Sequence, residues 1–548
     1  MSRRLFAVWT VFVGLVVGTI GMVMFYGQAV GVNFSIYTSL VLVAVIGSAV
    51  YAQREVNWRN LWLVIPALFF AMMVAVRASE WLLFWNVVAA LALLGLTLHY
   101  MGLKTPFDLS SSLEQFFALI EAGVRVVLGD GFVALFESGR WLRDQRGEEA
   151  GKTAAVVRGL VLTVPVLVVF GVLLGSADAV FGTYISRVQT LFRLDGLEAL
   201  IGRTLLSLWF GWVAIGAIAY AVMRHWQPNA DADDELVFPT AATPDDDDDE
   251  SDAPIKRTIL PFRIGVIEST MLLGSVTVLF GAFVLVQFVY LFGGAETVTT
   301  ENLTYAEYAR RGFFELVTVS VLTMGLLLVT DNITVRDGRH ENTLFRVLSI
   351  VVIALVGVML MSAARRMSLY TAEFGLTHLR LWTSVFMGWL VVMFGFLVAL
   401  LFRVRKNVFS LGVVVSAIGF FVTMNLLSPD ALIAEHNINR AFEQGVELDA
   451  CYLMRQSGDA IPVIAQKYAE AASSDHQDIL GAVLYNYSER QNLRRSGNND
   501  ETFFASNLGR NRADRALASF EATEYAAEAR QRATESIPVS RCSYYYFD

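Results

Sequence analysis

Apolar runs of about 20 residues, nearly free of charge, recur along most of this chain of 548 residues. A helix of that length spans about 30 Å, which is the thickness of the hydrocarbon core of a bilayer. Charged residues make up only 17% of the chain, whereas they make up about 25% of an average soluble protein. The sequence therefore predicts an all-α fold, a polytopic helical membrane bundle surrounded by lipid.

The apolar runs predict eleven spanning helices. We expect them near residues 5–26, 35–52, 59–77, 80–100, 155–176, 203–224, 264–292, 312–331, 343–363, 380–402 and 407–427. No small-residue cleavage site follows the first run, so we expect that helix to be retained rather than removed as a signal peptide.

Lysine and arginine are divided unequally between the two sides of such a bundle. If Arg3 and Arg4 lie in the cytoplasm, the inside segments hold 21 of the 42 Lys and Arg residues and the outside loops hold 9. Loops rich in these residues stay on the cytoplasmic side. The sequence therefore predicts a cytoplasmic N-terminus and an extracytoplasmic C-terminus, although one helix more or fewer would reverse the side of the C-terminus.

Polar segments divide the chain into six predicted domains. Residues 101–154 alternate apolar and charged faces, which indicates amphipathic helices on the cytoplasmic surface; a soluble helical hairpin packed on the bundle fits equally well. Residues 226–262 include the run from Asp245 to Glu250 and predict a disordered, acidic cytoplasmic linker. The remaining domains are 1–100 with four spanning helices, 155–225 with two, 263–427 with five, and 428–548.

Residues 428–548 predict an extracytoplasmic helical domain, with helices near 460–472, 476–493 and 501–531. Both cysteines of the chain, Cys451 and Cys542, fall in this region. An oxidising compartment permits a disulfide between them, and two unpaired thiols are the alternative.

Signatures of a cofactor or of a catalytic site are absent from the sequence. The six histidines form no HExxH motif and no cluster with cysteine. We find no P-loop, no GxGxxG after a strand and no GxSxG motif. We therefore expect no catalytic residue, metal or cofactor. No basic tract suggests nucleic acid, so the expected partners are the lipid bilayer and a protein partner of the C-terminal domain, while the oligomeric state stays open.

The segment 305–330 joins a charged, aromatic half to an uncharged, apolar half. Such a join is typical of a helix that passes from the membrane interface into hydrocarbon. Thr304 and Glu307 fit a capping box, which predicts that a helix begins here. Glu307, Arg311 and Glu315 follow at steps of four and share one face. Glu315 would then lie just inside the apolar zone, where a carboxylate needs a partner.

Further ionisable residues gather on the same predicted side of the membrane, some of them in an expected loop before the tenth helix, from Arg365 to Arg380. The candidate polar cluster consists of Asp178, Tyr308, Arg310, Arg311, Glu315, Arg365, Arg366, Tyr370, Glu373, His378 and Arg380. The functional interpretation is an outward-open site whose arginines clamp an anion. The structural interpretation, which the nearly balanced charges favour, is an ion-pair network that fixes helix packing.

Several segments of the chain are similar to one known family. SADAVF, TYAEYARRGFFEL, EFGLTHLRLW, SPDALIAEHNINRA and the early GQAVGVNFSIY resemble the bacterial inner-membrane proteins grouped as domain of unknown function 4153/4173. The YAEYARRGFFEL block is the most specific of these segments. The resemblance implies a multi-pass protein of a bacterial inner membrane, and it supplies no activity, substrate or catalytic residue.

Three functions are compatible with these features. A non-enzymatic sensor, scaffold or envelope-assembly component would use the outer domain and the polar cluster. A transporter or channel would use Arg311, Glu315, Glu373 and Asp178 as an outward-facing site, although no internal repeat is visible. An enzyme acting on a lipid-linked substrate is disfavoured, because the first outer loop, near residues 27–34, contains no acidic residue.

Overall fold

The structure is a computed structural model. It describes residues 2–54, 56–103, 107, 110–141, 197–224, 264–292, 313–336, 338–402, 407–497 and 503–521. In these ranges the chain is helical and contains no strand, apart from an isolated bridge between Ile264 and Thr334. The predicted all-α fold is therefore confirmed.

Ten helices in the described ranges are long and apolar enough to cross a membrane. The first five are α1 (Arg3–Phe25), α2 (Val32–Tyr51), α3 (Val64–Val76) with the preceding 3-10 turn η1 (Trp58–Leu63), α4 (Glu80–Tyr100), and α8 (Leu197–Ile218) with the following π-helical segment η3 (Ala219–Met223). The other five are α9 (Val266–Phe292), α12 (Phe313–Ile333), α13 (Arg339–Phe374), α14 (His378–Leu401) and α15 (Val408–Leu427). The eleventh predicted helix, 155–176, lies outside the described residues.

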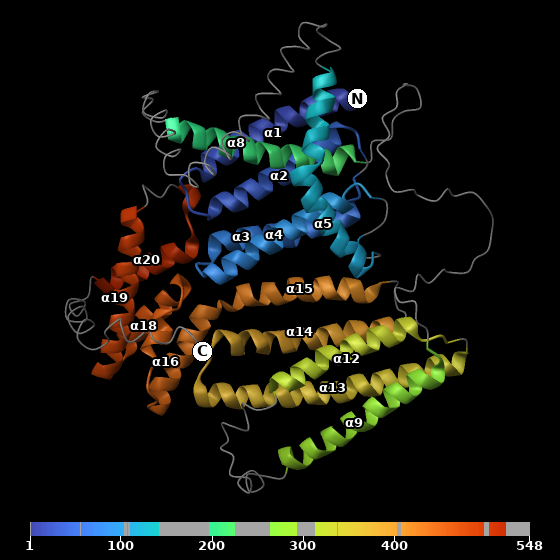
Figure 1. The fold of residues 1–548 in the computed structure, drawn as a ribbon. Coiled ribbons are helices and arrows are strands. Elements are labelled where there is room, and N and C mark those ends of the chain that lie inside the picture. Colours follow the sequence, from blue (N-terminus) through green and yellow to red (C-terminus); the bar gives the residue numbers. More distant parts are fainter. Residues whose placement is uncertain are drawn as a thin grey trace, which may run out of the picture. The chain divides into compact units, whose positions relative to one another are not determined.

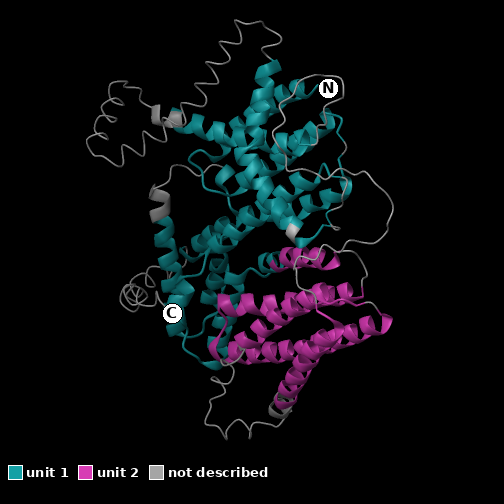
Figure 2. Cartoon of the chain, turned by 45° about the vertical axis from the view of Figure 1, so that its right-hand side comes forward, with its two compact units in different colours: residues 1–226, 421–548 teal, residues 227–420 magenta. Residues whose placement is uncertain are grey.

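The chain forms two compact units, which Figure 2 shows in different colours. Unit 1 comprises residues 1–226 and 421–548, and unit 2 comprises residues 227–420. Because the boundary falls within α15, the last turns of that helix belong to unit 1.

Unit 1 is built around close packing of α1 on α8. Gly14 and Gly18 of α1 face Gly211 of α8, and a Cβ added to Gly18 would collide with the backbone of Ser207 and Gly211. In lipid, small residues let helix backbones approach and gain van der Waals contact. The GxxxG spacing in α1 therefore sets this contact.

Two helices of unit 1 run across the spans rather than beside them (Figure 1). They are α5 (Ser112–Leu128), which contacts α4 and α8, and a helical stretch at residues 130–141. Ser111 and Glu114 form a capping box at the start of α5. The structure thus contains helices in this segment, while their amphipathic character and their place at the cytoplasmic surface stay predictions.

The C-terminal helices have a core of their own. They are α16 (Pro429–Gln444), α17 (Ala450–Met454), η5 (Gly458–Ala460), α18 (Ile461–Glu470), α19 (Ser474–Gly497), η6 (Phe503–Ala505) and α20 (Leu508–Glu521). Ile438, Ile464, Leu480 and Leu484 are fully buried in that core. Cys451 lies in α17, and Cys542 lies outside the described residues, so the disulfide stays a prediction.

In unit 2 the spans pack around apolar side chains such as Leu327, Val352 and Leu397. One prediction is wrong here: the loop expected after residue 363 is the last part of α13, which continues to Phe374. Residues 364–374 contain no Gly or Pro, so the helix goes on beyond its apolar part until Gly375, whose φ is 77°. The end of the apolar run was not the end of the helix.

Candidate functional site

The structure describes seven of the eleven residues of the predicted polar cluster. Glu315 is exposed in the first turn of α12, and Arg365 and Glu373 are exposed on the last turns of α13. Arg366 and His378 are half-buried. Asp178, Tyr308, Arg310 and Arg311 lie outside the described residues, so an outward-facing site that includes them stays a prediction.

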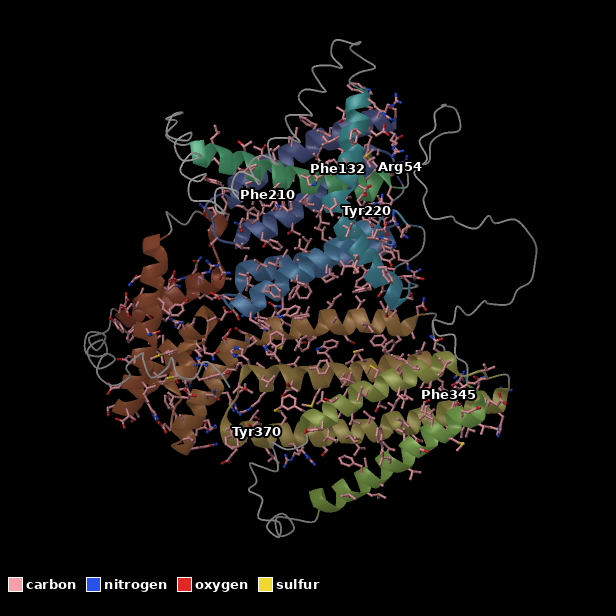
Figure 3. The ribbon with its side chains drawn as sticks, in the orientation of Figure 1. Arg54, Phe132, Phe210, Tyr220, Phe345 and Tyr370 are labelled. Carbon is pink, nitrogen blue, oxygen red and sulfur yellow. The ribbon has the colours of Figure 1, made fainter. Side chains whose placement is uncertain are left out.

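Tyr370 and Arg380 are the members of the cluster that the structure brings into contact. The guanidinium carbon of Arg380 lies 4.1 Å from the ring centroid of Tyr370, which Figure 3 labels on α13. Arg380 Nη1 also donates to the carbonyl of Phe374, at 3.1 Å, and to that of Gly375. These carbonyls end α13 and attract a cation. Arg380 therefore holds the turn between α13 and α14.

A partly buried ionic network, which the sequence analysis did not identify, lies in unit 1 where α5 crosses α4 and α8. We call it the His99 network, and it consists of His99, Glu121, Arg125, Asp130, Tyr220 and Arg224. Tyr220 lies at this crossing (Figure 3) and is 1% exposed. Two carboxylates balance two guanidinium groups, so the network is neutral when the imidazole is neutral.

Two contacts of His99 depend on which of its ring nitrogens carries the proton. Arg224 Nη1 lies 3.0 Å from His99 Nδ1, and the Tyr220 hydroxyl lies 2.7 Å from the same nitrogen. A guanidinium N–H can only donate, so Nδ1 must accept. The contact with Arg224 therefore fits the tautomer whose proton is on Nε2, whereas a proton on Nδ1 would face the Arg224 donor and the Glu121 carboxylate, whose Oε2 lies 3.9 Å away.

Glu121 and Asp130 hold the two arginines. Arg224 Nη2 lies 3.1 Å from Glu121 Oε1, and Arg125 Nη1 lies 3.2 Å from the same oxygen. Arg125 binds Asp130 through two hydrogen bonds, from Nε at 3.0 Å and from Nη2 at 2.8 Å. Such paired bonds fix direction as well as distance. Glu121 thus links α5 to the residue that follows the π-helical segment of α8.

That π-helical segment, η3, places Tyr220 in the network. All five of its residues are buried. A π-helical turn changes the direction of the side chains that follow it, and such segments are frequent at functional sites. No sequence signal marks it. The spacing of Glu121 and Arg125 predicts a helical pair. Their partner Arg224 is about 100 residues further along the chain, so no local pattern connects it to them.

A second polar centre lies at the other end of α4, where C-terminal residues hold the turn between α3 and α4. Asp459 Oδ2 accepts hydrogen bonds from the backbone N–H groups of Ala78, at 3.0 Å, and Ser79, at 3.3 Å. Ser79 is the N-cap residue of α4, and its side chain makes no capping bond. Asp459 therefore holds the turn that precedes α4 from a distant part of the chain, with its carboxylate near the positive end of the helix dipole.

Two asparagines, Asn425 and Asn507, complete this contact. We call the contact of Asn425, Asp459 and Asn507 with the turn Arg77–Ser79 the α3–α4 clasp. Asn507 Nδ2 donates to the carbonyls of Val74 and Arg77, both at 2.9 Å, and so satisfies the end of α3. Arg77 donates to the carbonyl of Asn425. A Cβ on Gly509 would lie 2.7 Å from the nitrogen of Ala78, so a glycine permits this approach.

The charge of Asp459 is opposed by its surroundings. Burial raises the pKa of Asp459 above its ordinary value, and the N–H groups of the turn and the charge of Arg77 offset only part of that effect. The clasp therefore contains one carboxylate whose ionised form is less favourable in place than in water.

A single helix connects the two centres. The 21 residues of α4 run from the turn held by Asp459 to the end that carries His99, a rise of about 30 Å. Between them, the buried amides of Asn86 and Asn425 exchange two hydrogen bonds, of 2.9 and 2.7 Å, which fix α4 to the end of α15. Polar pairs of this kind specify helix contacts in lipid.

In the described part of the chain, no group of three or more His, Cys, Asp or Glu residues could hold a metal ion.

Comparisons with known proteins agree with the predicted family. No curated protein matches the chain, and no solved structure matches it. The family described as domain of unknown function (DUF4153) matches residues 64–466, which is well over half of the chain and includes both polar centres except for Asn507. The chain therefore belongs to the DUF4153 family, as its YAEYARRGFFEL segment indicated.

Proposed function

We propose that this integral membrane protein is a non-enzymatic sensor in which a change at the C-terminal helices reaches the His99 network through α4. The observation that carries the proposal is that both ends of α4 are held by polar side chains from other parts of the chain. Asp459 binds the turn directly before its first residue, and His99 in its last turn binds Tyr220 and Arg224. Transmission between distant sites needs an element whose position both sites influence, and α4 has that property.

The His99 network is suited to respond to a small displacement. Its central bond, from Arg224 to His99 Nδ1, is 3.0 Å long, and a shift of about 1 Å would take such a bond beyond hydrogen-bonding range. Arg224 would keep its ion pair with Glu121, at 3.1 Å. The network can therefore lose the contact with α4 while its charges stay paired, which gives two arrangements of similar electrostatic energy.

The sides of the membrane are part of this proposal. The excess of Lys and Arg in alternate segments supports a cytoplasmic N-terminus. The His99 network then lies near the cytoplasmic side, and the C-terminal helices lie outside the cytoplasm, in the bacterial inner membrane that the family resemblance implies. A sensor of this arrangement would read an extracytoplasmic event.

Hydrogen–deuterium exchange in lipid nanodiscs tests the coupling. We expect Asp459→Ala to increase exchange both at residues 77–80 and in the distant η3 segment, because the two sites share α4. Coupling between sites is reciprocal, so Tyr220→Phe should increase exchange at residues 77–80. Asp475→Ala, an exposed position in α19, is the matched control and should change neither site.

The same experiment separates a sensor from a scaffold. A scaffold that only presents its C-terminal helices to a partner needs the clasp but no response at the His99 network. If each substitution altered exchange only around itself, the sensor proposal would be wrong and the scaffold would take its place.

A further inference from the structure

Helix α5 is apolar on two faces. Small residues on one face, Ala118, Ala122 and Val126, are buried against neighbouring helices of unit 1. The opposite face presents large apolar side chains that are 46–67% exposed: Phe116, Phe117, Ile120, Val124 and Leu128. We call this face the α5 stripe. A stripe of two phenylalanines and three aliphatic residues is too apolar to be an ordinary solvated helix face.

The place of α5 on the bundle gives the depth of the stripe. Leu119 lies against Gly95 of α4, with 3.3 Å to an added Cβ, and Gly95 is five residues, or about 8 Å, before the end of that helix. The Trp212 indole N–H donates to the carbonyl of Val127 at 2.7 Å. Both contacts lie within candidate membrane spans. An interfacial helix inserts its apolar face about 5–10 Å into the boundary of headgroups and acyl chains, which matches the depth of Gly95. Trp212 lies deeper, about 16 Å before the end of its span at Met223.

The stripe is continuous with apolar surface on the spans. Phe132, in the helical stretch after α5, packs edge-on against Trp212, with ring centroids 4.5 Å apart. Trp209, one turn earlier on α8, is 53% exposed. Exposed apolar side chains therefore lie on α8 and on the helical stretch after α5 as well as on the stripe itself.

The charged residues around the stripe indicate whether headgroup charge or apolar contact would hold it at a membrane. Residues 112–141 contain four carboxylates and two arginines, whereas helices that bind anionic lipid carry an excess of basic residues. Electrostatic attraction to the membrane surface is thus weak here, and apolar contact must supply the binding.

We infer that α5 and the helical stretch 130–141 are seated among the acyl chains of one leaflet, with the α5 stripe in direct contact with lipid. This inference does not depend on the coupling proposed above. It adds a consequence to it, because Glu121 and Arg125 lie on α5 beside the stripe. Lateral displacement of α5 by the leaflet would act directly on the ion pairs of the His99 network.

Photo-crosslinking of the full chain in nanodiscs tests the inference. The photoreactive residue p-benzoylphenylalanine replaces Phe117 or Leu128, which are 62% and 67% exposed, and adducts are identified by mass spectrometry. Val43, 68% exposed on the span α2, is the positive control. Glu489, exposed on α19, is the negative control.

We expect acyl-chain adducts at positions 117 and 128 in yields comparable to position 43 and well above position 489. The yields should be the same in zwitterionic and anionic nanodiscs, because apolar contact drives the seating. Absence of lipid adducts at both stripe positions, with adducts at position 43, would overturn the inference in favour of a solvated hairpin. Adducts to a second protein chain would overturn it as well, since the stripe would then be a protein interface.

Discussion

Removal of the Asp459 carboxylate should weaken the α3–α4 clasp by about the free energy of two hydrogen bonds. Asp459→Ala deletes the acceptor for two backbone N–H groups, those of Ala78 and Ser79, at 3.0 and 3.3 Å. A hydrogen bond contributes about 0.5–1.5 kcal/mol net, so loss of these two bonds costs on the order of 1–2 kcal/mol. The Ser79 hydroxyl makes no capping bond, so no local group replaces the lost acceptor. We therefore expect the clasp to open about 5–30 times more often, the factor that corresponds to this free energy.

Hydrogen–deuterium exchange of the amides at residues 77–80 measures that opening directly. The Asn side chain keeps an acceptor oxygen in the same position, so Asp459→Asn should leave the exchange rate close to that of the unchanged protein. The order of rates is thus Ala well above Asn, and Asn close to Asp. Equal rates for Asp459→Ala and the unchanged protein would refute the claim that this carboxylate holds the turn before α4, as would equal effects of the Ala and Asn substitutions.

The pH dependence of the same exchange follows from the pKa of Asp459, which burial raises above its ordinary value. The Asp459 carboxyl therefore binds its proton more tightly when the clasp is closed than when it is open. Its contribution to the free energy of closing the clasp is largest below the ordinary pKa and is lost as the pH rises through the raised pKa. We expect slower opening as the pH falls through this window, and Asp459→Asn should remove that dependence. Faster opening on acidification in the unchanged protein alone would show that the ionised form is favoured.

The remaining predictions concern packing, the His99 network and the cysteines. Tyr220→Phe removes the hydroxyl between His99 and its arginine, and it should lower the free energy of unfolding by about 1 kcal/mol, measured by denaturation in detergent. Gly18→Ala places a Cβ against the α8 backbone and should reduce the yield of folded protein, whereas Gly47→Ala, which has open space around it, should not. Cys542→Ser should change the mobility of the protein on a non-reducing gel, because the predicted disulfide closes a loop of roughly 90 residues and would contribute about 4–5 kcal/mol.

The spanning helices could be predicted from sequence because one physical requirement determines them. A polypeptide in hydrocarbon must satisfy its own backbone hydrogen bonds, so each apolar run of sufficient length becomes a helix. The expected span at 80–100 coincides with α4, and those at 35–52 and 407–427 differ from α2 and α15 by at most three residues at either end. The same reasoning failed at α13, whose polar last turns remain helical to Phe374. The end of the apolar run marks where the helix leaves hydrocarbon, whereas Gly375 marks where the helix itself ends.

The polar centres could not be predicted because their members are distant in sequence. Asp459 lies about 380 residues from the N–H groups that it binds, and no local pattern pairs them. The predicted cluster grouped charges by their place on one side of the membrane, which is a weaker constraint than contact. Of its described members, Tyr370 and Arg380 meet because they belong to consecutive helices joined by a short turn, and sequence proximity was sufficient to place them together.

The long separations in the clasp have a physical basis in the membrane environment. Lipid removes most of the hydrophobic driving force between spans, so close packing and hydrogen bonds must specify which helices meet. The buried pair Asn86–Asn425 does so for α4 and the end of α15. The stacked rings of Trp85, directly before Asn86, and Phe421, one turn before Asn425, have centroids 5.3 Å apart and support the same contact. Each asparagine has the other as its side-chain partner, and an amide left alone at that depth would be unsatisfied. The contact of α4 with α15 can therefore form only after residue 425 has been made, and Asp459 can bind the turn before α4 only after residue 459 has been made.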